Sequence, residues 1–329
     1  MRAHWGTSSS AFRGPDDAEA FYGDLIGGVS GPFENWPETA PVALPDGFRM
    51  GVWLDVGGGL ARHGADHASR LRALGITDAC IMVNGVSKKT FAYTSVSKTQ
   101  IRAFAGQIAM SNIQLTLTTW LRPKRAFIDA LVADLPAFAA EVGARAIEFD
   151  VEEPWTRGEP AGFRTHDEAA GYLFDSLRAN PHVDRLEIAT TCQVDQIGTP
   201  RMQRLLTESN VIVPQAYSTK SGNSSHRVGG EYGPRGLQGR AADRVANRAS
   251  TSGATTIMGL AAYSRSGWPG QSARDIMRME LEATVALRGP HPIEGARYWS
   301  WKHIAGNNGR GGSPANSYAG KFLEDVATP

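Results

Sequence analysis

Three carboxyl groups at alternate positions are the side chains of this chain best suited to chemistry. Glu148, Asp150 and Glu152 lie in one short segment, separated by Phe149 and Val151. Side chains two positions apart on a β-strand share a face, so a strand here would project all three carboxyl groups to one side. Neighbouring carboxyl groups raise each other's pKa, and a carboxyl group that keeps its proton can act as a general acid. The segment therefore predicts acid–base chemistry if its polar face is enclosed rather than spread on a solvated surface.

The elements that would position these groups follow a repeated alternation of strand and helix. Segments with helical periodicity, such as His67–Leu74, Ile128–Phe138 and Ala273–Val285, separate the strand-like runs. Ser97 and Thr165 have the form of capping residues at helix starts. Gly75 and Gly143 lie where helices should end before a strand. The strand-like runs are Met50–Val56, Thr77–Asn84, Gln114–Leu121, Ala146–Glu152, Arg185–Val194, Val211–Tyr217, Thr255–Ala262 and Ala296–Trp301.

This count and spacing predict an α/β protein of the (β/α)8, or TIM, barrel class in a single domain. A doubly wound open sheet is the competing fold, but the Gly-x-Gly-x-x-Gly sequence expected after its first strand is missing. Residues 1–48 are rich in Gly, Pro, Ser and acids, and we expect them to form an irregular segment packed on the barrel, which spans 49–329. The Gly-, Ser- and Arg-rich insertion Ser218–Gly239 follows the sixth strand, where it would form a wall of the active-site face.

Polar residues gather where the expected strands end. Catalytic groups of such barrels stand at the C-terminal ends of strands, whereas strand interiors are mostly packed with branched apolar residues. The acidic series of the fourth strand would face the interior, and further polar groups would meet it at the same end. These further groups are Asp55, Asn84, Gln193, Asp195, Gln215 and Tyr217. A lumen lined in this way predicts a polar ligand.

Tryptophan residues are concentrated at the same strand ends. They are Trp53, Trp120, Trp155, Trp268, Trp299 and Trp301. A single Trp in a strand is more often core than ligand platform, but six near one rim favour the stacking of sugar rings on flat aromatic faces. Trp301 is the candidate for the floor of the subsite where the bond would be cleaved.

These residues carry a resemblance to a known family. The segment Ile147–Pro154 resembles the fourth-strand Asp-x-Asp-x-Glu signature of chitinase-like glycoside hydrolases. The resemblance implies that Glu152 is the general acid and that Asp150 orients the substrate's acetamido group, which itself attacks the anomeric carbon. Gln215–Tyr217 resembles the sixth-strand element whose Tyr hydroxyl assists that group. Tyr298–Trp301 resembles the eighth strand that supplies the Trp floor.

The chain departs from that family in two places, and a second family shares part of its pattern. Glu148 stands where the family has Asp, and Thr116–Trp120 replaces the third-strand Ser-x-Gly-Gly. Lysozymes of the Chalaropsis type, common in phage lysins, are similar in the Asp-x-Glu of Asp150–Glu152, in an Asp on strand one such as Asp55, and at Trp299–Trp301. Both families act on N-acetylhexosamine polymers with retention of configuration, so the resemblance implies a retaining glycosidase acting on peptidoglycan or a chitin-like polymer.

The amino-acid composition limits the binding partners and the cellular location that we expect for this protein. With 34 basic and 33 acidic residues, the chain offers no polybasic surface for nucleic acid. No run approaches the roughly 18 apolar residues of a membrane span, and no signal core is present. We therefore expect a soluble protein, either cytoplasmic or exported by a non-classical or phage-type route, whose partner is a polysaccharide. Cys80 and Cys192 lie in apolar runs and predict buried free thiols.

Two other functional readings stay open at this level. One is a catalytically inactive barrel that binds glycan. The other is a glycosidase that works by double displacement on another polysaccharide, which needs a second carboxylate about 5–5.5 Å from the acid. Asp55 or Asp195 would supply it. No Gly-x-Ser-x-Gly elbow and no His or Cys motif with metal-ligand spacing occurs, so we expect neither a cofactor nor a metal.

Overall fold

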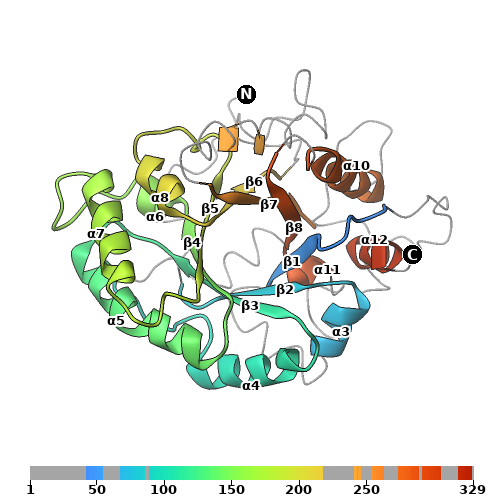
Figure 1. Cartoon of the computed structure of the whole chain (residues 1–329), viewed down its shortest axis with the longest axis horizontal. Coiled ribbons are helices and arrows are strands. Elements are labelled where there is room, and N and C mark those ends of the chain that lie inside the picture. Colours follow the sequence, from blue (N-terminus) through green and yellow to red (C-terminus); the bar gives the residue numbers. More distant parts are fainter. Residues whose placement is uncertain are drawn as a thin grey trace, which may run out of the picture.

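The computed structural model describes residues 42–54, 67–85, 89–217, 241–242, 244–245, 253–262, 273–288, 291–304 and 318–327. Within them, parallel strands close a barrel in the order in which they occur in the sequence, and helices surround it (Figure 1). The strands are β1 (Arg49–Leu54), β2 (Asp78–Met82), β3 (Gln114–Trp120), β4 (Ala146–Val151), β5 (Glu187–Gln193), β6 (Val211–Gln215), β7 (Thr255–Ala261) and β8 (Ile293–Trp299). The helices are α3 (His67–Ala73), α4 (Lys98–Ala109), α5 (Arg125–Glu141), α6 (Glu153–Thr156), α7 (His166–Arg178), α8 (Gln203–Glu208), α10 (Ala273–Ala286), α11 (Trp301–Ile304) and α12 (Tyr318–Ala327).

The expected (β/α)8 barrel is confirmed. Each strand pairs in parallel with its neighbours in sequence, and β1 also pairs with β8, which closes the barrel. All eight expected strands are present, although β8 begins and ends earlier than its sequence pattern indicated. A cis peptide bond joins Trp299, the last residue of β8, to Ser300, and α11 begins at Trp301.

The helix ends follow the expected local rules. Ser97 caps α4 with a full capping box, in which its side chain accepts from the Gln100 backbone while the Gln100 side chain accepts from the Ser97 backbone. Thr165 caps α7 by accepting from the backbone N–H of Glu168 at 3.1 Å. Gly75 and Gly143 have φ of 66° and 65°, the left-handed conformation that glycine adopts without a steric penalty.

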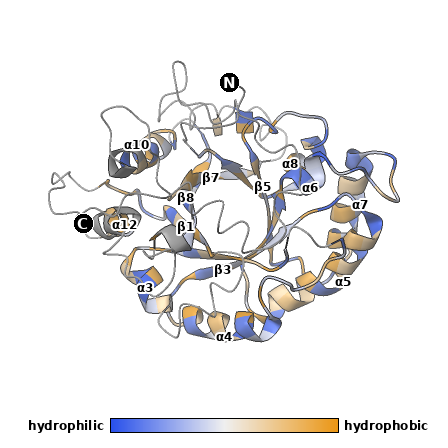
Figure 2. Ribbon diagram, turned by 180° about the vertical axis from the view of Figure 1, so that it is seen from behind, coloured by the Kyte–Doolittle hydropathy of each residue, from blue (hydrophilic) through white to orange (hydrophobic). Residues whose placement is uncertain are grey.

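The main hydrophobic core lies between the strands and the helices. Ile147, Phe149 and Val151 of β4 belong to it, and all three are fully buried. The rings of Phe149 and Phe174, on α7, meet edge to face with centroids 6.4 Å apart. Figure 2 shows the corresponding pattern on the helices, where α4, α5 and α7 carry both hydrophobic and hydrophilic residues. This outer core fixes β4 so that its alternate side chains point into the barrel.

The barrel interior has an apolar part that is small. The residues of this cluster are Trp53, Cys80, Ala189, Val211, Val213 and Ile257, with Tyr217 and Trp299 packed against it. Polar and charged side chains also face the interior, including Arg297 and Glu148, whose side chains are 1% and 0% exposed. This filling differs from the branched apolar layers usual in such barrels.

Several expectations concern residues that lie outside the described ranges. They are the irregular segment before residue 42, the insertion Ser218–Gly239, Asp55 and Trp268. Both cysteines are buried free thiols, as expected. None of the described helices combines the length and the apolar character that crossing a bilayer requires.

Candidate active site

Strand β4 sets the acidic series at three depths in the barrel. Glu148 pairs in register with Thr118 of β3, Asp150 pairs with Trp120, and Glu152 lies just beyond the strand as the residue before α6. Glu148 contacts side chains of β1 and β8, on the other side of the barrel, so this face of β4 points inward. The alternation seen in the sequence thus places the three carboxyl groups along one line from the interior to the C-terminal mouth.

Glu148, the deepest of the three, is bound by three other side chains. Its Oε1 accepts from the Trp53 indole N–H at 2.7 Å and from the Thr118 hydroxyl at 3.3 Å. Its Oε2 forms an ion pair with Arg297 Nη1. Sequence analysis grouped Glu148 with the reacting carboxyl groups, but complete burial and three donors give it a supporting position beneath them.

Asp150 is buried and has a carboxyl oxygen without a hydrogen-bond partner among the described residues. Its residue is 6% exposed, and no group in the described part of the chain hydrogen-bonds its buried Oδ1. Burial, followed by the charges of Glu152 and Glu148, raises the pKa of Asp150 well above its ordinary range. A buried polar atom without a partner is costly, and such atoms in a native fold often indicate a functional position.

Glu152 is partly exposed and lies nearest the mouth. The side-chain amide of Gln215, at the end of β6, donates to its Oε1 at 2.8 Å. Burial of the carboxyl group and the nearby charge of Glu153 raise the pKa of Glu152, against the opposing effect of the Gln215 hydrogen bond. Asp150 and Glu152 therefore form an acid pair, with raised pKa values on both members and no arginine or lysine among the causes.

Aromatic residues lie at several strand ends on the same side of the barrel as the acid pair. Trp299 is partly exposed at the end of β8, and its ring lies edge-on to that of Trp53 with centroids 6.0 Å apart. Tyr217 is partly exposed beyond β6 and packs on the same interior cluster. Trp120 is partly exposed at the end of β3, as the register partner of Asp150. Trp53 itself is 3% exposed, so it offers almost no surface to a ligand.

Trp155 and Trp301, which the sequence analysis expected at the rim, are buried instead. Trp155, in α6, is 0% exposed, donates its indole N–H to the Arg201 carbonyl oxygen at 3.1 Å and packs against His166. Trp301 is also 0% exposed, within the main core. The physical reason is that β8 ends at Trp299, so Trp301 belongs to α11 and packs inside rather than at the mouth.

Of the remaining polar residues, Asn84 holds a neighbouring residue in place, whereas Asp195 has an oxygen without a partner among the described residues. Asn84 is buried and uses both ends of its amide on the Trp120 backbone, accepting at 2.8 Å and donating at 3.2 Å, so it fixes Trp120 in place. Asp195, after β5, is partly exposed, and its buried Oδ1 lacks a partner among the described residues. Within the same ranges, no three His, Cys, Asp or Glu side chains are placed to share a metal ion.

Arg297 is a residue of the barrel interior that the sequence analysis did not identify. The residue lies within β8 and fills the centre of the barrel. The sequence does hold a signal in retrospect: Gly51 and Gly259, its register partners on the two neighbouring strands, have no side chain to compete for that space. Reading that signal requires the register, which one sequence does not supply.

Comparisons with known proteins bear on the fold. No protein-family model matches this chain, and no curated protein sequence does. A GH113 β-mannanase from Alicyclobacillus acidocaldarius is similar in structure, with a TM-score of 0.54 and 15% identity, covering 86% of this chain and 96% of that one. The spore cortex-lytic enzyme SleL of Bacillus megaterium gives a TM-score of 0.51 at 13% identity, covering 88% of this chain and 75% of that one.

A GH18 chitinase from Pseudoalteromonas aurantia is also similar, with a TM-score of 0.52 and 10% identity, covering 79% of this chain and 96% of that one. At such identities the likeness establishes the barrel fold and no more, because one barrel supports many chemistries.

Proposed function

We propose that this protein is a retaining glycoside hydrolase that cleaves an N-acetylhexosamine-containing polysaccharide, with Glu152 as the general acid. The observation that carries the proposal is the acid pair at the mouth of the barrel. Both carboxyl groups have raised pKa values, one has a buried oxygen without a partner among the described residues, and partly exposed aromatic residues lie at the ends of β3 and β8 and beyond β6. Several structures that share the fold bear the names of glycoside hydrolases, which supports the same reaction class.

In the proposed first step, Glu152 gives its proton to the glycosidic oxygen as the bond to the anomeric carbon breaks. The carbonyl oxygen of the substrate's own acetamido group bonds to the anomeric carbon, which forms a cyclic oxazolinium ion. Asp150, as a carboxylate, would stabilise the positive charge of that ring, and the Tyr217 hydroxyl would hold the acetamido group. The sugar on the leaving side departs as an alcohol.

In the second step, water adds to the anomeric carbon and gives its proton to the Glu152 carboxylate. The bond to the acetamido oxygen breaks, and the two displacements together retain the anomeric configuration. A single group can serve as acid and then as base when its pKa lies near the working pH, which the raised pKa of Glu152 favours.

We assign the sugar contact at the cleaved bond to Trp299 and Tyr217 rather than to Trp301. Trp299 keeps part of its surface exposed at the mouth, and Trp53 holds its ring edge-on from inside. Aromatic faces of this kind bind the flat apolar faces of sugar rings. Trp120, anchored by Asn84, would contact a neighbouring sugar.

Double displacement through an enzyme carboxylate is the second candidate, favoured by the buried Oδ1 of Asp195, which lacks a partner among the described residues. It requires a second carboxylate close to Glu152. Among the described residues we assign this role to Asp195, with Asp55 as the alternative outside the described ranges. Trapping a covalent sugar adduct on Asp195 or Asp55 would establish this mechanism and exclude the assisted one.

The assisted mechanism makes a specific demand on Asp150. A thiazoline analogue of the cyclised sugar should bind far more tightly than the free sugar, because it resembles the intermediate. Asp150→Asn should weaken that preference, since the carboxylate would no longer face the positive ring. Unchanged thiazoline affinity in this variant would exclude the assisted mechanism.

The general-acid assignment is tested by Glu152→Gln on peptidoglycan and on chitin oligomers, with the products analysed by mass spectrometry. We expect turnover to fall about 10²–10⁴-fold, the usual contribution of a positioned acid. Glu159→Gln is the control, because Glu159 is an exposed glutamate of the same segment after β4 and is not among the causes of the pKa shift of Glu152. Turnover of more than a few per cent in folded Glu152→Gln would contradict the assignment. Binding of glycan without turnover by the unaltered protein would favour the inactive, glycan-binding alternative.

A further inference from the structure

Trp53 of β1 lies in the barrel interior beside Trp299, and the proposed reaction gives it no role. Trp53 is 3% exposed, whereas Trp299 keeps part of its surface exposed at the end of β8. The two residues are register partners on neighbouring strands, and their rings meet edge to face with centroids 6.0 Å apart and planes at 61°. Because Trp53 offers almost no surface to a ligand, it can act on a bound sugar through the ring of Trp299.

Groups from three other strands restrain the ring of Trp53. Its indole N–H donates to Glu148 Oε1, on β4, at 2.7 Å. The guanidinium carbon of Arg297, on β8, lies over the ring at 5.3 Å from its centre, where a cation is attracted to the aromatic face. A Cβ at Gly259 of β7 would lie 3.3 Å from Trp53 Cη2, so the far edge of the indole lies against the β7 backbone. Rotation or tilting of this ring would break at least one of these contacts.

Glu148 is itself held in the position from which it accepts the indole N–H. Its Oε2 forms an ion pair with Arg297 Nη1, and the two side chains are 0% and 1% exposed. The Thr118 hydroxyl donates to its Oε1 at 3.3 Å. A Cβ at Gly51 would lie 3.1 Å from Arg297 Cγ, so the arginine has little free space on the side of β1. Desolvation offsets most of the Coulombic attraction in so deeply buried a pair, so stability alone does not explain it.

We propose that Glu148 is a positioning residue for the aromatic part of the site. Held by Arg297, it fixes the ring of Trp53 through the indole N–H, and Trp53 in turn fixes the ring of Trp299 at the angle at which it stacks on a sugar. The inference rests on the proposed function for the role of Trp299 as a sugar contact. A partly exposed side chain without such support exchanges between rotamers, and ordering it when the glycan binds would lower the affinity. Holding the ring in advance avoids that loss.

Fluorine NMR of the full-length protein labelled with 5-fluorotryptophan tests this series of contacts without any glycan. Loss of one resonance in Trp299→Phe assigns that ring. In the double variant of Glu148→Leu with Arg297→Met, neither member of the ion pair is left as an unpaired charge, and the indole N–H of Trp53 loses its acceptor. We expect the Trp299 resonance to shift and broaden, because the ring then exchanges between orientations. An unchanged Trp299 resonance would overturn the proposal.

The matched double variant combines Glu148→Gln with Arg297→Met. It also removes the ion pair, but it keeps a side-chain carbonyl oxygen that accepts from the indole N–H of Trp53. It should hold the Trp299 resonance close to that of the unaltered protein. Equal shifts in the two double variants would mean that the hydrogen bond to Trp53 does not position the Trp299 ring, which would refute the proposal.

Glycan affinity provides a measurement that does not depend on the folding of the double variants. Calorimetry uses chitin and peptidoglycan oligomers with Glu152→Gln, whose slow turnover leaves the ligand intact. Adding Trp53→Phe keeps the ion pair but removes the indole N–H, and we expect binding to weaken about two- to tenfold. The same change should cost nothing further in a Trp299→Ala background, because its effect passes through that ring. No loss from Trp53→Phe, or an equal loss in both backgrounds, would contradict the proposal.

Phe138→Leu is the control for a general loss of stability. It alters an edge-to-face contact between Phe138, on α5, and Tyr93, whose ring centroids lie 5.2 Å apart outside the barrel. It should lower the unfolding midpoint and leave the Trp299 resonance unchanged. A shift as large as that in the Glu148→Leu double variant would identify lost stability as the cause and would overturn the proposal.

The two measurements separate this inference from the proposed function. A Trp299 ring that responds to the Glu148 variants, in a protein that binds no glycan, would refute the proposed function alone. Glycan binding that depends on Trp299, with a ring that does not respond to those variants, would refute this inference alone.

Discussion

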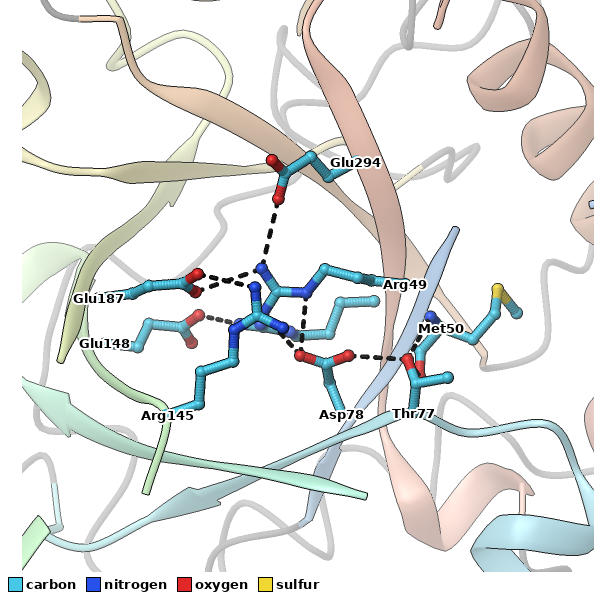
Figure 3. A network of polar contacts seen from close by, with 9 residues as sticks. Arg49, Met50, Thr77, Asp78, Arg145, Glu148, Glu187 and Glu294 are labelled. Carbon is cyan, nitrogen blue, oxygen red and sulfur yellow. Dashed lines mark hydrogen bonds and ion pairs between the residues drawn. The ribbon is translucent and has the colours of Figure 1, made fainter. Parts of the chain in front are cut away.

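Both ends of the barrel interior contain carboxyl groups, but the charges that surround these groups are opposite at the two ends. At the floor, Arg49 binds Asp78 at 2.6 Å, Glu187 at 3.2 Å and Glu294 at 3.4 Å, and Arg145 adds a contact to Glu187 at 2.7 Å (Figure 3). At the mouth, the side-chain amide of Gln215 donates to Glu152, and no cation in the described part of the chain pairs with either member of the acid pair.

The pKa shifts at the two ends differ accordingly. Burial alone would raise the pKa of Asp78, but the charge and hydrogen bonds of Arg49 lower it below its ordinary value. Burial also raises the pKa of Asp150, and the neighbouring carboxylates raise it further. The comparison teaches that in this barrel the presence of a cation, more than burial, separates a structural carboxylate from one that can hold a proton.

The largest effect at the floor should come from Arg49→Met. This change leaves Asp78 buried without its partner, which typically costs about 3–5 kcal/mol of unfolding free energy. Chemical denaturation measures it, and Arg102→Met, which breaks the exposed pair with Glu141, should leave the unfolding free energy unchanged within error. A shift in the titration of Asp150 in Arg49→Met would show that the two ends are not independent.

The stabilisation of the fold by the Arg49–Asp78 ion pair should also depend on pH. The pKa of Asp78 is lower in the folded chain, so its ion pair stabilises the fold above the unfolded pKa of about 4. That contribution is lost as the pH falls through the folded pKa. The difference in stability between Arg49→Met and the unaltered protein should therefore narrow below about pH 4.

At the mouth, Asp150→Asn should have the opposite sign and a smaller size. The acid pair keeps a proton, shared between Asp150 and Glu152, that the two groups have released in the unfolded chain, so folding becomes less favourable as the pH rises above about 4. Replacing the group with an amide should stabilise the fold by roughly 1 kcal/mol at neutral pH and by almost nothing at pH 3. Thermal unfolding across this pH range measures it, and destabilisation at neutral pH would contradict our account of the acid pair.

The smallest of these effects concerns Trp299→Ala. Loss of one stacking face should weaken substrate binding by about 0.5–1.5 kcal/mol, or up to roughly tenfold in KM. Trp301→Ala is the informative comparison, because that buried ring should affect the unfolding midpoint more than KM. If Trp301→Ala changed KM alone, the assignment of the sugar contact to Trp299 would fail.

The sequence was sufficient for the repeating parts of this fold and insufficient for its central contacts. Strand count, the inward face of β4 and the caps at Ser97 and Thr165 follow from periodicity and local hydrogen bonding, which act over a few residues. The ion pair of Glu148 with Arg297 joins residues 149 positions apart, and no local rule selects one arginine for it.

The aromatic rim shows a second kind of limit. The expected eighth strand extended to Trp301, because the sequence Tyr298–Trp301 continues the alternation past the point where the strand ends. An overrun of two residues keeps the same face of a strand, so the pattern gave no sign of the error. Helix α11 begins at Trp301, and for this reason the ring of Trp301 packs in the main core.

The glycines beside Arg297 constrain the order in which this barrel can change during evolution. A Cβ at Gly259 would lie 2.8 Å from the Pro214 carbonyl oxygen, and one at Gly51 would press on the Arg297 side chain itself. A lineage that still carries Arg297 can accept a larger residue at position 51 only with difficulty, whereas one that has lost the arginine gains that freedom. Once such a residue has become established, the arginine no longer fits, and a descendant that has dropped the central charge has little chance of recovering it.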